Sequence, residues 1–327
     1  MRAFKYNYVV FFNNADFYRI AYHDMTMYPD VKPFFGFQPE NNLLAKLFHF
    51  HTSRKVNAVI RLPFKSLWMN RFAKFDFDND KPLCFVFMAT YLAYEYVRQF
   101  VKSLHYEYPQ AKFVCYYSDI IKDKTISPKQ LSTLFDFFIS YDPEEAKKYN
   151  IQYHPTSFSD VTVENNDFIN PSDVYYLAWP KDRLQKVYKI YDQLCNAGLN
   201  CCFYLVGVPK EQQKAGITYL NNWMSYYSNL QYVIKSKCLL EIEQGGASGA
   251  TLRTWESINF GRGLITDNYS LSGTKFYNPK YISFISKENL VDIDFVKNYK
   301  VGANPVSEMI RPAQLFRFID CLITKVL

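Results

Sequence analysis

Residues 239–268 read LLEIEQGGASGATLRTWESINFGRGLITDN, and this stretch decides how the fold is predicted. It holds an apolar strand (Leu239–Glu243), a loop of small residues, a helix (Thr251–Phe260) closed by a glycine, and a second strand (Gly263–Thr266). Small residues let backbone N–H groups approach a ligand closely, and the start of the following helix favours negative charge. Arg253 lies in the first helical turn, where the dipole alone would favour an acid, and therefore indicates a bound anion.

The rest of the chain alternates apolar runs with amphipathic helical patterns, which is typical of βαβ units. Residues 13–40 contain three prolines and a glycine and are expected to be a loop, while residues 156–172 are polar and are expected to link two domains. The predicted fold class is α/β, with two Rossmann-like doubly wound domains facing a cleft. Further predicted strands are Tyr8–Phe12, Leu83–Met88, Lys112–Tyr117, Phe135–Ser140, Val174–Ala178, Cys202–Val206 and Tyr232–Val233, and further predicted helices include Asn42–His51, Ala93–Tyr106, Asp182–Cys195, Thr218–Tyr227 and a closing helix at 306–327.

Length and composition describe a globular protein of one large or two ordinary domains, with 327 residues of which 49% are hydrophobic. Aromatic residues reach 19%, which reflects either a biased base composition of the gene or tyrosines that line a carbohydrate site. The seven cysteines form no CxxC pair and lie mostly in apolar runs, as reduced core residues do. We see no signal peptide and no transmembrane run, so we expect a cytoplasmic protein.

The positive charge is concentrated in residues 41–75, which contain seven Lys or Arg residues and no acid, against a net charge of +7 for the chain. Basic residues interleaved with Leu, Phe and Trp are typical of segments that bind an anionic membrane surface. The alternative is an ordinary amphipathic helix with a solvated basic face. We do not expect a nucleic-acid partner, because no binding motif is present and the rest of the chain is balanced in charge. The residues expected at this surface are Lys46, Arg54, Lys55, Arg61, Lys65, Trp68 and Arg71.

Neither a metal nor a dinucleotide cofactor is expected. Asp76-Phe77-Asp78 is a DxD sequence, but it precedes a strand instead of following one, and such pairs of acids are common. His49 and His51 have no cysteine or carboxylate cluster nearby. The sequence contains no Walker A motif and no GxGxxG after a first strand, which argues against an NAD-dependent oxidoreductase or epimerase.

Four segments of the second half resemble the nucleotide-sugar domain of GT-B glycosyltransferases, in particular bacterial enzymes of capsule, exopolysaccharide and lipopolysaccharide synthesis. The first half is similar in pattern only. The sequence departs from the family at Ala178, where many members have glycine, and in the wide spacing of Glu241 and Glu256. The matching segments are DVYYLAWPKDRLQKVYKIYDQL at 173–194, GLNCCFYLVGV at 198–208, LLEIEQGGASGATLRTWES at 239–257 and GRGLITDN at 261–268.

The resemblance implies a donor site for a nucleotide-diphosphate sugar in residues 173–305, an acceptor domain in residues 1–155, and no cofactor beyond this substrate. Lys181 and Arg183 would lie near the diphosphate, and a glutamate would hold ribose or sugar hydroxyls. A lipid-linked oligosaccharide at the inner face of the cell membrane would be the acceptor. The implied donor-site residues are Lys181, Arg183, Glu241, Gln244, Gly249, Thr251, Arg253 and Glu256.

An inverting transfer also requires a base for the acceptor hydroxyl. Asp119 follows a predicted strand of the first domain and is our candidate, although a capping role in a turn would suit it equally. His23 and Asp24 are rival candidates on an early loop. A non-catalytic nucleotide-binding scaffold of a polysaccharide assembly complex is the main alternative to an enzyme.

Overall fold

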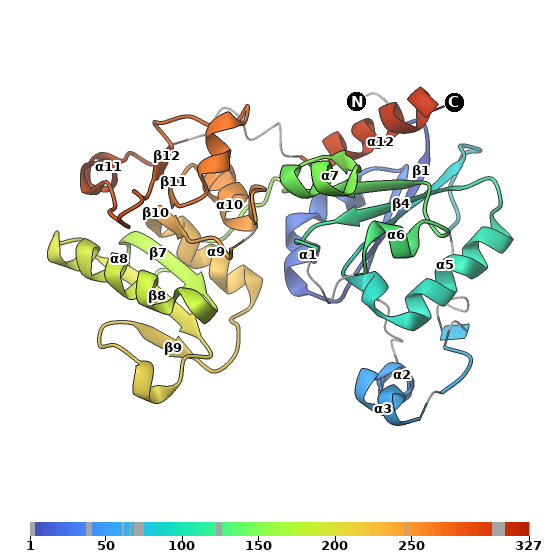
Figure 1. Ribbon diagram of the computed structural model, residues 1–327, viewed down its shortest axis with the longest axis horizontal. Coiled ribbons are helices and arrows are strands. Elements are labelled where there is room, and N and C mark those ends of the chain that lie inside the picture. The colour runs from blue at the N-terminus through green and yellow to red at the C-terminus, as the bar shows by residue number, and fades with distance from the viewer. Residues whose placement is uncertain are drawn as a thin grey trace. The chain divides into compact units, whose positions relative to one another are not determined.

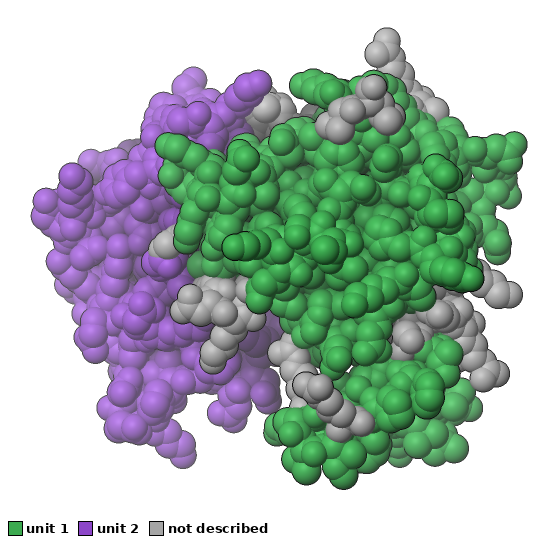
Figure 2. Space-filling model, turned by 45° about the vertical axis from the view of Figure 1, so that its right-hand side comes forward, with its two compact units in different colours: residues 1–155, 312–327 green, residues 156–311 purple. Residues whose placement is uncertain are grey.

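The computed structural model describes residues 4–36, 41–60, 62–65, 67–68, 75–121, 126–245, 247–302 and 311–326. The chain divides into two compact units, which Figure 2 shows in different colours. Unit 1 comprises residues 1–155 together with 312–327, and unit 2 comprises residues 156–311. The C-terminal helix α12 (Pro312–Val326) thus belongs with the N-terminal unit and not with the residues that precede it.

Unit 1 is built on a parallel sheet with the strand order β2-β1-β3-β4-β5-β6 in the described part of the chain. Its central strands are apolar and buried on both faces, as expected for a sheet covered by helices on both sides. The strands are β1 (Asn7–Phe12), β2 (Val31–Phe35), β3 (Leu83–Met88), β4 (Lys112–Tyr117), β5 (Phe137–Ser140) and β6 (Gln152–Tyr153). The helices are α1 (Asp16–Ala21), α2 (Asn42–Thr52), α3 (Arg54–Val59), α5 (Glu95–Glu107), α6 (Pro128–Leu131) and α7 (Pro143–Tyr149), besides α12, with the 3-10 turns η1 (His23–Met27) and η2 (Tyr91–Ala93).

The two faces of this sheet pack against different helices. Val9 and Phe11 lie in the core cluster that α5 completes with Phe100. The alternate residue Tyr8 faces the other way, where its ring lies 4.7 Å from that of Phe316 in α12. Side chains of a strand alternate between faces, so β1 by itself connects both layers. Figure 1 shows α12 and α5 on either side of the strands, and α2 and α3 at the periphery of the unit beyond α5.

Unit 2 contains a second parallel sheet with the strand order β12-β11-β10-β7-β8-β9 in the described residues. The chain moves outward from β7 through β8 to β9 and then returns, so that β10 pairs with the other edge of β7. The strands are β7 (Ser172–Ala178), β8 (Cys201–Val206), β9 (Thr218–Leu220), β10 (Ser236–Glu241), β11 (Gly263–Thr266) and β12 (Ile282–Phe284). The helices are α8 (Leu184–Asn196), α9 (Tyr226–Ile234), α10 (Leu252–Phe260) and α11 (Ile293–Asn298), with 3-10 turns η3 (Lys181–Arg183), η4 (Lys210–Gln212) and η5 (Tyr269–Gly273).

Helix α8 covers one face of this sheet with a fully buried stripe that includes Val187, Ile190 and Leu194. Burial of each such side chain stabilises the unit by about 1.5–3 kcal/mol. Helices α9 and α10 cover the other face, where Tyr175 stacks on Tyr232 at 5.6 Å. Helix α10 ends at Gly261, whose φ of 61° is the left-handed conformation that closes a helix. The fold class predicted from the sequence is thus confirmed: each unit is a doubly wound, Rossmann-like domain.

Three local predictions were wrong. Residues 13–40 were expected to be a loop, but they include β2, an edge strand that accommodates Pro33. Thr218–Tyr227 was predicted as a helix, yet its first three residues form β9 and its last two begin α9. Tyr232–Val233 was predicted as a strand and lies inside α9, because the helix buries Val233 and stacks Tyr232 on the sheet.

Candidate functional site

The carboxyl ends of β7 and β10 are neighbours at the point where the chain reverses its direction across the second sheet. Ligands of open parallel sheets bind at such a switch point. Lys181 follows β7 and Gln244 follows β10, and the ammonium of Lys181 donates a hydrogen bond of 3.2 Å to the side-chain oxygen of Gln244. Two residues of the predicted donor site are therefore in contact across the β7/β10 switch point.

Lys181 itself adopts an unusual backbone conformation. Its φ of 49° is left-handed, which is uncommon for a residue other than glycine. Its side chain is exposed, and within the described ranges no carboxylate forms an ion pair with it. Strained residues of this kind concentrate at functional sites. The site thus presents an unneutralised ammonium at the β7/β10 switch point.

Arg183 holds this turn in place. Its guanidinium donates to the backbone carbonyls of Trp179 (2.9 Å), Pro180 (3.3 Å) and Ile242. The first two carbonyls follow β7 and the third follows β10, so one side chain ties both strand ends together. The sequence suggested that Arg183 would lie near a diphosphate. In this structure three of its five N–H donors bind these backbone carbonyls, two of which lie in the turn that carries Lys181, and its contact with a diphosphate stays a prediction.

Glu241, at the end of β10, is buried and accepts hydrogen bonds from three threonine hydroxyls. Thr254 donates at 2.9 Å and Thr266 at 2.6 Å, and Thr251 is the third donor. Burial raises the pKa of Glu241, and the three hydroxyls oppose this shift. The carboxylate connects β10, β11 and the start of α10. In this structure the carboxylate therefore holds these three elements together. Its contact with ribose or sugar hydroxyls stays a prediction.

The loop before α10 is anchored from the neighbouring strand β11. Asn268 is buried, and its side-chain amide donates to the carbonyl of Gly249 at 3.1 Å. The hydroxyl of Ser270 donates to the carbonyl of Ser248. Thr251 is the N-cap of α10, and its hydroxyl oxygen accepts the amide of Arg253 at 3.1 Å. These contacts fix Gly249 and Thr251 at the start of α10, next to the positive end of the helix dipole, in the loop that also contains Gln244.

The guanidinium of Arg253 is paired within unit 2. Its Nη1 lies 2.6 Å from the Glu256 carboxylate, and the two side chains are only 13% and 2% exposed. Glu256 also accepts hydrogen bonds from Tyr226 (2.8 Å) and Asn229 (3.0 Å) of α9. The guanidinium lies over the ring of Tyr175 at 5.3 Å. The anion that the sequence suggested for Arg253 is thus, in this structure, the carboxylate of Glu256. Contact of either residue with a donor stays a prediction.

Sequence reasoning missed several residues of this site. Asn268 and Asp267 directly follow β11, and Asp267 accepts the amide of Glu243 and pairs with Lys186 at 2.7 Å. Trp179 is the first residue after β7 and lies two residues before Lys181. Their signal was their place immediately after a predicted strand, where polar and aromatic side chains reach the ligand-binding edge of a parallel sheet.

The first sheet has a corresponding switch point between β1 and β3. There the Asn13 side chain, after β1, donates to the hydroxyl of Thr90, after β3, at 3.1 Å. Neither residue was predicted. Asp119 follows β4, the next strand along; it is exposed and accepts the amide of Ile120 at 2.8 Å, as a turn cap does. Its role as a base stays a prediction.

The rival bases His23 and Asp24 occupy a different part of unit 1. They lie on η1, which leads into the start of β2, whereas Asp119 follows the end of β4. Tyr22, the residue before His23, packs its ring 4.9 Å from that of Phe12, the last residue of β1. A role of His23 or Asp24 as the base therefore stays a prediction.

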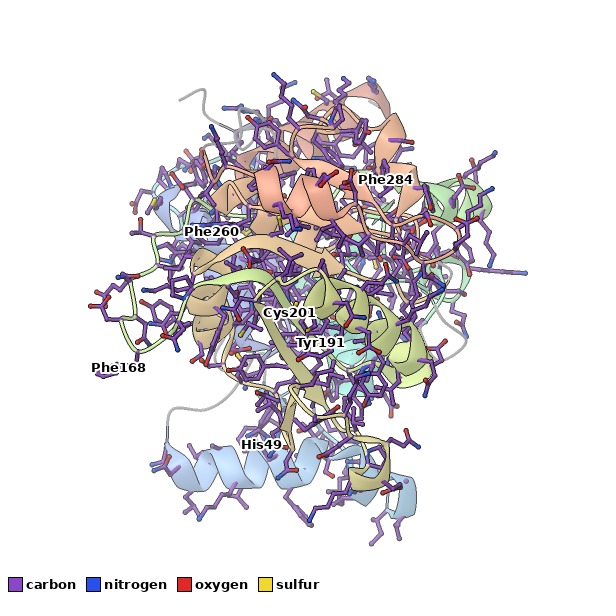
Figure 3. All side chains as sticks on the ribbon, turned by 90° about the vertical axis from the view of Figure 1, so that its left-hand side faces the viewer. His49, Phe168, Tyr191, Cys201, Phe260 and Phe284 are labelled. Atoms are coloured by element: carbon purple, nitrogen blue, oxygen red, sulfur yellow. The ribbon has the colours of Figure 1, made fainter. Side chains whose placement is uncertain are left out.

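Helices α2 and α3 and the residues after them expose large apolar side chains. Phe48 packs into the core, but Leu43, Leu47 and Phe50 form an exposed stripe at helical spacing. We call the exposed set the α2–α3 apolar surface; its members are 49% to 84% exposed. They are Leu43, Leu47, Phe50, Val59, Ile60, Phe64 and Leu67. Figure 3 labels His49 on α2 and shows side chains of this helix projecting into solvent.

The predicted basic residues of this segment do not behave alike. Lys46 and Lys55 are exposed. Lys65 was expected at the surface but is buried, and its ammonium donates to the carbonyl of Leu62, which offsets part of the cost of burying the charge. Trp68 is half-buried and donates to His51 at 2.8 Å. Arg61, Arg71 and the side chain of Arg54 lie outside the described residues.

No group of three or more His, Cys, Asp or Glu side chains in the described ranges is arranged to hold a metal ion. Among the helices that the structure describes, none is long and apolar enough to cross a membrane.

Comparison with known proteins gives a likeness of fold. No protein-family model matches the sequence, and no curated protein matches it. An alpha,alpha-trehalose-phosphate synthase (UDP-forming) from Burkholderia vietnamiensis aligns with a TM-score of 0.50 and 7% identity, covering 95% of this chain and 94% of the other. A trehalose-6-phosphate synthase aligns with a TM-score of 0.55 and 8% identity, covering 98% of both chains. Both are GT-B glycosyltransferases, and the two units of this chain have the Rossmann-like folds of that architecture.

Proposed function

We propose that the protein is a glycosyltransferase that takes a sugar from a nucleotide-diphosphate sugar bound at the β7/β10 switch point. The observation that carries this proposal is the contact of Gln244, in the anchored loop that opens α10, with Lys181, which is exposed and has no carboxylate partner among the described residues. An ammonium and a helix N-terminus together suit the charge of a diphosphate. The fold shared with UDP-forming synthases supports the same conclusion.

In the reaction, an acceptor hydroxyl attacks the anomeric carbon, and the bond from that carbon to the diphosphate oxygen breaks. Negative charge grows on the leaving nucleoside diphosphate. Lys181 and the start of α10 would stabilise that charge, and fixed donors of this kind need no reorganisation during the reaction. We propose that they suffice without a metal ion. Asp119 is the proposed base for the acceptor proton.

For the acceptor, we propose a lipid-linked oligosaccharide of surface-polysaccharide synthesis, reached at the inner face of the cell membrane. The α2–α3 apolar surface supports this, since it combines seven exposed apolar side chains with Lys46 and Lys55 and no acid in residues 41–75. Insertion of partly exposed Leu, Ile and Phe side chains contributes about 1 kcal/mol each. Attraction to anionic lipid adds about 1 kcal/mol per lysine.

The donor site is tested by calorimetric titration with UDP, GDP, ADP, TDP, CMP and NAD, each with magnesium and with EDTA. We expect one nucleoside diphosphate to bind equally well in EDTA, and Lys181→Ala to weaken it about 10-fold or more. Lys189→Ala, an exposed lysine of α8, is the matched control and should bind normally. Binding of NAD alone, or a strict magnesium requirement, would contradict the proposal. Nucleotide binding without any sugar transfer or donor hydrolysis would favour the scaffold.

The membrane surface is tested by co-sedimentation with vesicles of phosphatidylcholine alone or mixed with phosphatidylglycerol. We expect binding to the mixed vesicles, lost in the double variant Leu47→Ser, Phe50→Ser. The control is Phe168→Ser, which removes an equally prominent apolar side chain, 98% exposed, from unit 2 (Figure 3). Equal binding by both variants would refute a role for the α2–α3 apolar surface.

A further inference from the structure

Trp179 presents an exposed indole ring at the carboxyl edge of the second sheet. It is the first residue after β7 and is 46% exposed, although large apolar rings are normally covered. Within the described ranges no other aromatic ring stacks on it. The ring instead lies against Gly207, the first residue after the neighbouring strand β8.

The ring of Trp179 packs closely on the backbone of Gly207 because this residue has no side chain. A Cβ atom at this position would lie 3.0 Å from Cε2 and Cζ2 of Trp179, so even a methyl group would force the indole to shift by a few tenths of an ångström. The glycine has a φ of 69°, and its amide donates to the carbonyl of Leu220 at 3.1 Å. A backbone held in this way provides a firm backing for the indole and leaves nearly half of the side chain open to solvent.

The turn that carries Trp179 is also fixed. Arg183 donates to the carbonyl of Trp179 at 2.9 Å, and Lys181 is two residues further along the chain. The Cα atoms of these two residues are therefore at most roughly 7 Å apart. An exposed aromatic ring and the exposed Lys181 ammonium are thus carried by one turn, whose backbone Arg183 fixes.

We propose that Trp179 is the platform on which the nucleobase of the donor stacks. This inference rests on the proposed function, and it assigns the base to the β7/β8 side of the site while the diphosphate lies at Lys181. A flat, open indole suits any base, because every base has an aromatic face. Trp179 would thus contribute affinity for nucleotides as a class and not the choice among them.

The test compares the affinity for a nucleoside diphosphate with the affinity for pyrophosphate, which carries the charge but no base. Wild type, Trp179→Ala and Trp179→Phe are titrated with the best-binding nucleoside diphosphate and with pyrophosphate. We expect Trp179→Ala to lower the affinity for the nucleoside diphosphate about 10-fold or more, and Trp179→Phe to lower it less. Pyrophosphate should bind to all three proteins with the same affinity. Nucleotide should also quench tryptophan fluorescence in wild type, and this quenching should be missing in Trp179→Phe.

Two glycine variants separate stacking from backbone strain. Gly207→Ala should weaken nucleotide binding in the same direction as Trp179→Ala but by less, because the new methyl group would lie 3.0 Å from the ring and push it by a few tenths of an ångström. Gly198→Ala is the matched control: its φ is 77°, so it is equally strained, but nothing lies within 4 Å of the added Cβ. It should bind nucleotide like wild type at a temperature where both variants are folded.

The outcomes are distinguishable. Normal nucleotide affinity in Trp179→Ala, or an equal loss for pyrophosphate, would overturn the platform and leave the donor site intact. Quenching by the free sugar alone would show that a sugar ring, not a base, occupies the indole, and would also overturn it. A wild-type protein that binds neither nucleoside diphosphate nor pyrophosphate would overturn the proposed function together with this inference.

Discussion

Replacing Arg253 by Met should destabilise unit 2 strongly, because the Glu256 carboxylate then remains buried without its cation. In the structure the pair is 2.6 Å apart, and Glu256 is 2% exposed. Breaking a buried ion pair by removing one partner costs about 3–5 kcal/mol. Tyr226 and Asn229 still donate to the carboxylate, so we expect a loss near the lower limit, about 3 kcal/mol.

The partner variant identifies the cause. Glu256→Gln in the Arg253→Met background removes the buried charge and keeps an oxygen that can accept from Tyr226 and Asn229. We therefore expect the double variant to regain most of the lost stability and to fall within about 1 kcal/mol of wild type. Urea unfolding followed by tryptophan fluorescence is a suitable assay, since Trp255 is buried beside Glu256.

The deficit of Arg253→Met should also depend on pH. Burial raises the pKa of Glu256, and Arg253 opposes this shift, so the pKa should rise further in the variant. A carboxyl whose pKa is higher in the folded than in the unfolded state favours folding at low pH and loses this contribution as pH rises through the folded pKa. The deficit should therefore be largest near pH 8 and shrink toward pH 5.

Two results would refute this reasoning: a loss below about 1 kcal/mol in Arg253→Met, or a double variant no more stable than the single one. The outcome also affects how ligand binding is interpreted. Loss of nucleotide binding in Arg253→Ala alone would not distinguish a lost contact from a damaged fold. Loss in the stable double variant would identify a direct contact with the donor.

Three further predictions concern other buried polar groups. Thr266→Val should lower the free energy of unfolding in urea by about 1–3 kcal/mol, because a hydroxyl that donates to Glu241 at 2.6 Å is removed. Thr218→Val, at an exposed position of β9, is the control. An equal loss in both variants would refute the structural role of the hydrogen bonds to Glu241. Asn268→Ala should weaken pyrophosphate binding several-fold, since the carbonyl of Gly249 loses its donor; unchanged affinity would show that the loop needs no such anchor. Burial lowers the pKa of His154 from about 6.5 to about 4, so protonation disfavours the folded state and stability should fall by about 3 kcal/mol as pH drops through that window. His154→Phe should flatten this dependence, and an equal slope in both proteins would refute the assignment.

The buried strands could be predicted from the sequence because their signal is local. Strands covered on both faces are continuous apolar runs, and Leu83–Met88, Lys112–Tyr117 and Gly263–Thr266 were predicted with the bounds that the structure shows. The start of α10 was predicted equally well, because a cap and a closing glycine are short-range features.

The wrong predictions arose where local and tertiary preferences disagree. Tyr232 and Val233 favour strands by propensity, but in α9 the ring of Tyr232 stacks on Tyr175 and Val233 is buried. The cap at Ser225, which accepts the amide of Ser228 at 3.1 Å, marked the start of that helix and was overlooked. The strand β2 was not predicted because it contains Pro33, which argues against an interior strand. β2 lies at the edge of the sheet, where a proline is tolerated.

The sequence by itself determined the two doubly wound domains and the loop–helix element that marks the candidate site, since these depend on apolar periodicity and on neighbouring residues. Only the tertiary structure decided what each polar side chain contacts. It paired Arg253 with Glu256, buried Lys65, and brought Trp179 to Gly207 and Asn13 to Thr90. Trp179 and Gly207, like Asn13 and Thr90, are far apart in the chain, and the order of strands in each sheet brings them together, which leaves no pattern along the sequence. Arg253 and Glu256 are only three residues apart, but the sequence does not show that both are buried.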